Sequence, residues 1–316
     1  MKSIVFVFVF FLISSCGLEM VIDVDLPEYD KQMVLLSQIN PDSNNVKVYL
    51  SHSVSLEEPN SNFNYINNAE VKLFIDDVLL DSLQLGFELG EYLYNSKTQI
   101  YEYDTIYFYQ SAISVIAGSS YRLEATAPNI DEGLEPFSVT STVKVPDNID
   151  ITIVDFQDSI VSHSDGWEEK IRNITIGFDD LELDNYYQLF VFDGSYESYY
   201  ESSDPSLIAS VSFDPFMDET FYSGYDALFS DVLFNGETKQ IEFSIYVWEK
   251  DALSSLKVEL RNVSESYYYY YRSVDLHQMN EGNPFAEPVQ VYSNVENGLG
   301  IFTAYNESSQ VLNLNN

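Results

Sequence analysis

The residue best suited to carry a chemical modification is Cys16, the single cysteine of the chain. It follows an unbroken apolar run over residues 4–13, with Lys2 before the run and Ser14 and Ser15 directly before the cysteine. A positive start, a short apolar run and small residues before a cysteine indicate a lipoprotein signal peptide, whose cysteine is acylated and becomes the mature N-terminus. The run of about 10 residues is too short to cross a bilayer as a helix, which needs roughly 20.

We therefore predict a lipoprotein signal peptide over residues 1–15, lipidation at Cys16 and a lipidated tether over residues 16–30. With no second cysteine the chain cannot form an internal disulfide, although an exported protein would permit one. An acylated cysteine also leaves no thiol for catalysis or for a thiolate metal site.

The second feature with binding chemistry is a run of five consecutive tyrosines: Tyr267, Tyr268, Tyr269, Tyr270 and Tyr271. We predict a helix over residues 265–279, with Ser264 as its N-cap. Successive side chains on a helix point all round the axis, so roughly two or three of the five at most share a face. Some then fill the core while others lie at a domain or protein interface, where tyrosine is enriched. All five are candidate partner-binding residues, and stacking on a glycan is the alternative.

Acidic clusters are the candidate calcium ligands, because calcium takes about six to eight oxygen atoms. The densest are residues 179–184 and the pair Asp214 and Asp218, but none has the glycine and terminal glutamate of an EF-hand loop. Aspartates at β-turns are the ordinary explanation for such clusters. We predict no metal site and no cofactor, with calcium left as an alternative.

Catalytic motifs are missing from the sequence. His52, His163 and His277 lie far apart, and no nucleophile elbow, zinc-protease helix motif or phosphate-binding glycine loop is present. The chain has 51 acidic residues, so paired carboxylates for glycoside cleavage arise too easily to identify a pair. We predict that the protein is not an enzyme, with a hydrolase lacking a recognisable motif as the second alternative.

Three tripeptides combine Asp, Ser or Thr, and an aliphatic residue. They resemble the acceptor used for O-glycosylation of exported Bacteroidota proteins, and their hydroxyl residues are Ser82, Thr105 and Ser159. These three residues are candidate O-glycosylation sites.

Composition narrows the class of partner. The formal net charge is −37, with 14 basic residues, and such a surface repels nucleic acid, whose binding depends on Lys and Arg. It repels anionic lipid headgroups as well, so the acyl chains alone should hold the protein to a membrane. Hydrophobic residues make up 45% of the chain, enough to fold around a core despite the charge.

Short runs with period-two alternation predict strands along the whole chain. We expect a mainly all-β protein with two β-sandwich-like domains: an N-terminal Ig-like β-sandwich over residues 31–146 and a C-terminal β-rich domain over residues 147–316. Asp76 and Asp77 should form a hairpin turn. Residues 225–232 and 265–279 are candidate short helices. The expected strands cover residues 34–39, 46–51, 69–75, 78–80, 105–109, 121–126, 137–145, 151–156, 170–178, 186–192, 208–213, 240–248, 256–260, 289–292 and 300–304.

The C-terminal region resembles a known family. The sequences Asn-Pro-Phe-Ala-Glu-Pro at 283–288 and Val-Tyr-Ser-Asn-Val-Glu-Asn-Gly-Leu-Gly-Ile-Phe at 291–302 are similar to the closing signature of Bacteroidota lipoproteins grouped as domain-of-unknown-function family 4249 (DUF4249). Residues 67–71 and 229–236 match two further family stretches, whereas residues 196–225 do not align. Gly298 and Gly300 of the signature would allow a tight turn or bulge before the last strand.

The resemblance implies an outer-membrane lipoprotein, often encoded beside a TonB-dependent transporter, and brings no catalytic residues. We therefore expect a non-enzymatic lipoprotein, lipid-anchored in the outer membrane at the cell surface. It would act as an accessory subunit of an outer-membrane barrel such as a TonB-dependent transporter, in substrate capture or assembly. A stand-alone glycan- or peptide-binding surface lipoprotein is the alternative.

Overall fold

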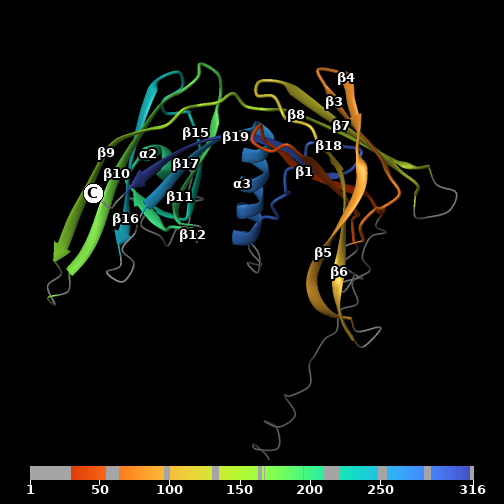
Figure 1. The fold of residues 1–316 in the computed structure, drawn as a ribbon, viewed down its shortest axis with the longest axis horizontal. Helices are drawn as coiled ribbons and strands as arrows, with labels where there is room; N and C mark the ends of the chain where they lie inside the picture. The colour runs from red at the N-terminus through yellow and green to blue at the C-terminus, as the bar shows by residue number, and fades with distance from the viewer. Residues whose placement is uncertain are drawn as a thin grey trace, which may run out of the picture. The chain divides into compact units, whose positions relative to one another are not determined.

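Strands account for most of the fold, as the alternating sequence predicts (Figure 1). The computed structural model describes residues 30–54, 64–95, 100–129, 135–162, 166, 168–194, 196–209, 221–247, 255–280 and 286–313. Within these residues lie nineteen strands in three sheets and two helices, α2 (Pro205–Ile208) and α3 (Glu265–Asn280). The mainly β fold class is confirmed. The signal peptide, Cys16 and nearly all of the tether lie outside the described residues.

The largest sheet has nine strands, in the order β12-β11-β17-β19-β1-β2-β6-β5, with β15 paired to β11. The strands are β1 (Met33–Ile39), β2 (Val46–His52), β5 (Gln84–Asn95), β6 (Ile100–Ser111), β11 (Tyr186–Asp193), β12 (Tyr196–Glu197), β15 (Asp226–Ser230), β17 (Ser255–Val263) and β19 (Leu299–Asn313). Only the β1–β19 pair within this sheet is parallel. That pair joins the two ends of the described chain.

Strand β19 belongs to both halves of the large sheet. Its residues 299–304 pair with β1, and its residues 305–313 pair with β17. Gly300 has φ of 109°, and a Cβ there would overlap the carbonyl oxygen of Leu35 on β1. A glycine is therefore required where β19 approaches β1. The sequence-based prediction of a tight backbone feature at the last strand is confirmed, with Asn297 at φ 61° in the preceding turn.

A five-stranded sheet covers one face of the half of the large sheet that contains β1 and β2. It consists, in spatial order, of β18 (Val295–Glu296), β8 (Phe137–Lys144), β7 (Ser120–Ala127), β3 (Glu70–Ile75) and β4 (Val78–Ser82). Leu35 and Leu50 of the large sheet pack with Leu73 and Leu123 of this sheet in one buried cluster. Two sheets with a shared apolar core form a β-sandwich.

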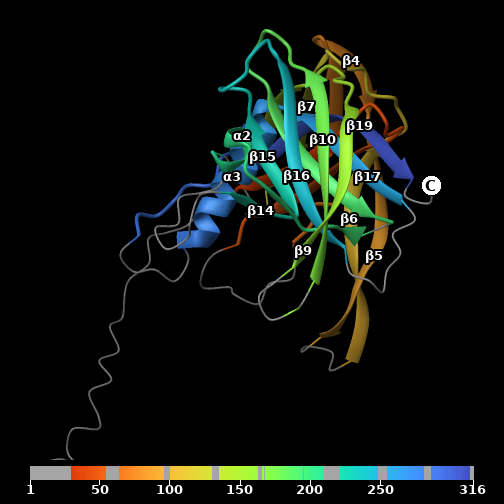
Figure 2. The same cartoon turned by 90° about the vertical axis from the view of Figure 1, so that its left-hand side faces the viewer.

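A second five-stranded sheet forms the other sandwich. Its order is β14 (Tyr222–Gly224), β13 (Tyr200–Ser202), β16 (Thr238–Val247), β10 (Glu168–Asp179) and β9 (Thr152–Ser162), and Figure 2 shows β16, β10 and β9 side by side. Ile174 and Phe243 pack there with Tyr187, Phe229 and Leu260 of the large sheet.

The chain passes from the first core to the second between Val145 and Ile149. Strand β19 contributes to both cores, Phe302 to the first and Leu312 to the second. Residues Lys31–Asn316 form one compact unit. Separate domains with a boundary at residues 146 and 147 therefore stay a prediction.

The turn expected at Asp76 and Asp77 is confirmed. Both residues have positive φ, 45° and 65°, and they join β3 to β4 as a two-residue hairpin. Two successive positive φ values define the turn type whose twist suits a hairpin, and aspartate tolerates them.

Two sequence-based expectations are wrong. Within residues 225–232, Asp226–Ser230 form strand β15 instead of a helix, because Ala227 and Phe229 point into the second core while β11 supplies the hydrogen-bond ladder. Residues 289–292 are not a strand, because side chains of α3 hold this segment: Ser273 Oγ accepts from the Tyr292 amide at 2.8 Å. Where a strand over residues 208–213 was expected, Ile208 is instead the last residue of α2, and residues 210–213 lie outside the described residues.

Candidate functional site

Helix α3 begins where the sequence predicts, and its first turn is tied to β19. Ser264 Oγ accepts hydrogen bonds from the amides of Tyr267 and Ala304, and Ser266 Oγ donates to the Phe302 carbonyl at 3.1 Å. An N-cap serine satisfies amides that the helix leaves unpaired. The helix is therefore fixed on the large sheet, on the face opposite the second core.

The five tyrosines divide between packing and surface. Tyr267 is only 3% exposed, and its hydroxyl donates to Gln188 Oε1 at 2.6 Å. Tyr269 is 42% exposed, Tyr271 is also exposed, and Tyr268 and Tyr270 are half-buried. The prediction that few of the five share a face is thus confirmed. Their role in partner binding stays a prediction, and only the exposed members are available for it.

A groove runs beside α3, and we call it the tyrosine groove. It encloses about 640 Å³ between α3 and the segment that follows β15. Tyr268 stacks on Tyr186 of β11 with ring centroids 4.5 Å apart, and Tyr269 meets Tyr186 edge to face at 5.9 Å. Arg272 lies one turn further along the helix and lines the same groove. An aromatic wall with a cation and several polar groups suits a ligand that has both a flat apolar face and polar substituents.

The wall of the tyrosine groove opposite α3 is stabilised by the buried carboxylate of Asp231. Asp231 Oδ2 accepts from the Asn185 amide at 2.7 Å, and the Asn185 side chain donates to the carbonyls of Leu181 and Leu183. Burial raises the pKa of Asp231, and the hydrogen bond from the Asn185 amide partly offsets that rise. The carboxylate therefore fixes the loop at the cost of its own desolvation.

A smaller hollow of about 350 Å³, the acidic hollow, adjoins the same helix. Asp226, Asp275 and Tyr271 line it, and Arg272 lines both spaces. Burial raises the pKa of Asp275, and the charge of Asp226 raises it further, while Arg272 opposes both effects. Arg272 is thus the cation shared by the two spaces.

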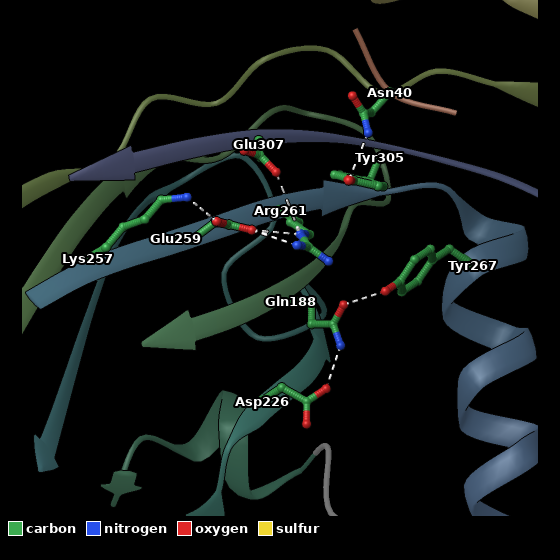
Figure 3. Close-up of polar contacts among 9 residues, drawn as sticks. All are labelled: Asn40, Gln188, Asp226, Lys257, Glu259, Arg261, Tyr267, Tyr305 and Glu307. Atoms are coloured by element: carbon green, nitrogen blue, oxygen red, sulfur yellow. Dashed lines mark hydrogen bonds and ion pairs between the residues drawn. The ribbon is translucent and has the colours of Figure 1, made fainter. Parts of the chain in front are cut away.

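Behind α3, the sheet carries a buried polar network (Figure 3). Glu259 of β17 is buried, and its carboxylate pairs with Lys257 at 2.6 Å and with Arg261 at 2.8 Å. The Arg261 guanidinium also lies over the rings of Phe190 and Tyr305, 4.5 and 4.6 Å from their centroids. A buried charge costs free energy unless it is paired, and Lys257 and Arg261 pair the buried Glu259 carboxylate.

The network continues to the acidic hollow, which Gln188 and Asp226 line. Gln188 accepts from Tyr267 with its oxygen and donates to Asp226 with its nitrogen, at 2.6 and 2.5 Å (Figure 3). Sequence reasoning missed this network. Its sequence signal is the alternation of Lys257, Glu259 and Arg261, which places three charged side chains on one face of a strand whose other face is core.

The other sequence-predicted sites lie apart from the groove. Ser82 is exposed at the end of β4, and Thr105 and Ser159 are half-buried on β6 and β9. The Ser159 hydroxyl donates to the Ile171 carbonyl at 3.4 Å. Of the three candidate O-glycosylation residues, Ser82 is therefore the most accessible. Cys16 lies outside the described residues.

No three His, Cys, Asp or Glu side chains converge as metal ligands in the described ranges. Within residues 179–184, Asp179 accepts from Thr238 and Asp180 accepts from the Gly236 amide, so these carboxylates stabilise local turns. Asp214, Asp218 and His163 lie outside the described residues, and His277 Nδ1 is 3.1 Å from the Val289 carbonyl.

Among the helices that the structure describes, none has the length and apolarity needed to cross a membrane. The family model described as "Domain of unknown function (DUF4249)" matches residues 19–311. The chain belongs to this family.

No curated protein matches the chain. Among solved structures, it is similar to a protein from Corynebacterium diphtheriae described as membrane anchored, with 9% identity and a TM-score of 0.20. The match covers 76% of this chain and 56% of that one, so this chain spans little more than half of the relative. A similarity of that size carries no argument about fold or function.

Proposed function

We propose that this protein is a non-enzymatic, lipid-anchored accessory subunit of a TonB-dependent transporter at the surface of the outer membrane, where it captures substrate for the transporter. The tyrosine groove is the observation that carries the proposal. Its volume of about 640 Å³ is within the range of about 300–1,000 Å³ typical of small-ligand sites.

The groove favours a ligand with hydroxyl groups and one anionic group. Tyr186 and Tyr268 give a stacked aromatic wall, Arg272 gives a cation, and Asn235 and Ser273 add neutral polar groups. Aromatic faces stack on the apolar faces of sugar rings and on peptide side chains, and guanidinium binds carboxylate or phosphate through paired hydrogen bonds. Tyr268 and Tyr269 are the residues of the run proposed to contact this ligand, whereas Tyr271 lines the acidic hollow and Tyr267 supports the helix.

Anchoring at Cys16 is part of the proposal. One acyl chain gives only marginal membrane binding, and the lipoprotein modification supplies several. The net charge of −37 keeps the folded part away from anionic headgroups, so the acyl chains are the membrane contact.

Purification of the native protein in mild detergent tests the proposal. We expect a TonB-dependent transporter to remain bound in a fixed ratio, and a Cys16→Ala variant to leave the membrane fraction unless that partner retains it. A protein that is recovered alone from intact outer membranes contradicts the subunit role.

A stand-alone glycan- or peptide-binding lipoprotein is the second candidate, since the tyrosine groove would serve it equally. In that case binding of a glycan or peptide by the purified chain would fall in Tyr269→Ala and Arg272→Met variants, while no transporter would co-purify. The two measurements together separate the candidates.

A further inference from the structure

Strands β5 and β6 extend beyond the rest of their sheet. Each has 12 residues, whereas β1 and β2 have 7. Strand β2 pairs with β6 only through residues 109–111, so residues 100–108 of β6 pair with β5 alone. The two strands therefore form a two-stranded ribbon that extends past the sandwich (Figure 1).

One face of the ribbon carries a row of apolar and aromatic side chains, which we call the apolar stripe: Leu85, Phe87, Leu89, Tyr92, Tyr101 and Tyr103. Phe87 is 68% exposed, and Tyr103 is 57% exposed. Strand pairing places Leu85 opposite Tyr109, which is buried in the first core, so the stripe continues the core face into solvent. Tyr92 lies 4.9 Å from Tyr103 and 5.6 Å from Tyr101, ring centroid to ring centroid.

A bulge keeps the stripe on one face. The register shifts between Leu89 and Tyr92, and Tyr92 then pairs with Tyr103. A bulge inserts an extra residue and lets the following side chain keep its face. Without it, Tyr92 would point to the face that carries Glu88.

On the opposite face of the ribbon, the side chains have partners within the protein. The Phe108 ring lies where a Cβ on Gly86 would stand, and Lys47 lies 4.2 Å above that ring. Lys47 also pairs with Glu88 at 3.1 Å. The two faces of the ribbon therefore differ: one is internally packed and charged, and the other is apolar and is left exposed by the residues that the structure describes.

An exposed apolar face on a two-stranded ribbon is costly, because such a ribbon has little stability of its own and invites association. A second copy of this chain is an unfavourable cover, since each copy carries a net charge of −37. An anionic lipid surface is unfavourable for the same reason. Charge complementarity to a net charge of −37 points instead to a protein whose apolar surface is flanked by Lys and Arg.

We propose that the apolar stripe of the β5–β6 ribbon is the surface that docks the protein on its transporter. This inference rests on the proposed function for the identity of the partner. It assigns docking to the ribbon and ligand capture to the tyrosine groove, which are formed by different parts of the sequence.

Site-specific photo-crosslinking in the full lipidated chain tests the proposal. A benzophenone amino acid replaces Phe87 in cells that make the protein, and the control position is Val78, a similarly exposed residue at the β3–β4 turn. We expect a crosslink to the TonB-dependent transporter from position 87 and none from position 78. An adduct with a second copy or with lipid, or equal transporter adducts from both positions, overturns the proposal.

The same experiment separates this inference from the proposed function. If the transporter co-purifies but position 87 gives no adduct, the docking surface is wrong and the subunit role stands. If the transporter neither co-purifies nor forms an adduct at position 87, both the subunit role and the docking surface are contradicted. A Phe87→Ser/Leu89→Ser variant should release the transporter with affinity reduced about tenfold or more. A Val78→Ser/Leu79→Ser control should retain it, and retention by the first variant contradicts docking through the stripe.

Discussion

Two tyrosine-rich regions of this protein use the same residue type in opposite ways. On α3, five consecutive tyrosines are distributed round the helix, so that Tyr267 is buried, Tyr268 and Tyr269 line the tyrosine groove, and Tyr271 lines the acidic hollow. On the β5–β6 ribbon, tyrosines alternate with acidic residues, so that Tyr101 and Tyr103 share one exposed face. The comparison teaches that spacing, more than the number of aromatic residues, determines whether they stabilise the fold or form an exposed surface.

The largest effect is expected at the buried end of the helical run. Tyr267→Ala removes a buried ring and its hydrogen bond to Gln188, and should lower the free energy of unfolding by about 3 kcal/mol. Tyr269→Ala is the matched control and should cost less than about 1 kcal/mol, because its ring is largely exposed. Urea denaturation of both variants measures the difference. Equal losses would show that the run does not divide between packing and surface.

The charged layer behind α3 should give the next largest effect. Glu259→Gln leaves Lys257 and Arg261 without the carboxylate that they share, and should lower the free energy of unfolding by about 2 kcal/mol. Both cations are partly exposed, so water limits the loss. An unchanged unfolding midpoint in denaturant would contradict a stabilising role for this network.

The pH dependence of stability tests the buried wall of the groove. Because burial raises the pKa of Asp231 above its usual 3.8, the folded state binds a proton more readily than the unfolded state does. The destabilising charge is therefore present at neutral pH and is relieved as the pH falls through the raised pKa. Asp231→Asn should remove this contribution and reduce the gain in stability on mild acidification, measured by denaturation at several pH values. A larger gain in the variant would contradict this assignment.

The smallest effect on stability is expected on the ribbon. Phe87→Ser/Leu89→Ser should change the free energy of unfolding of the purified chain by no more than about 0.5 kcal/mol, since both side chains are largely in solvent. Thermal unfolding of the purified variant checks this. A large loss would show that the stripe stabilises the fold and is not a free surface.

The sequence predicts local features of this fold well and non-local ones poorly. The Asp76–Asp77 hairpin and the start of α3 depend on turn and capping chemistry within a few residues, and both are confirmed. The parallel pairing of β1 with β19 joins segments more than 250 residues apart, which no local pattern specifies. Strand β15 was expected to be helical because its five residues are too few to show a clear period.

The candidate site was predicted only in part. The tyrosine run identified α3, but the groove also needs Tyr186 from β11 and the Asp231 loop, which only tertiary structure brings to the helix. The ribbon was missed because the expected strand covered residues 105–109 alone. The same alternation continues through Tyr103 and Tyr101, which are interleaved with acidic residues.

Accessibility of individual tyrosines in the native membrane tests the central claim most directly. Tyrosine-selective labelling, followed by mass spectrometry, would compare intact cells with the purified mature protein. The account predicts that Tyr101 and Tyr103 are labelled in the purified protein and protected in cells, that Tyr269 is labelled in both unless ligand fills the groove, and that Tyr267 is protected in both. Equal labelling of Tyr101 and Tyr103 in cells and in the purified protein would contradict the account, because the apolar stripe would then have no partner.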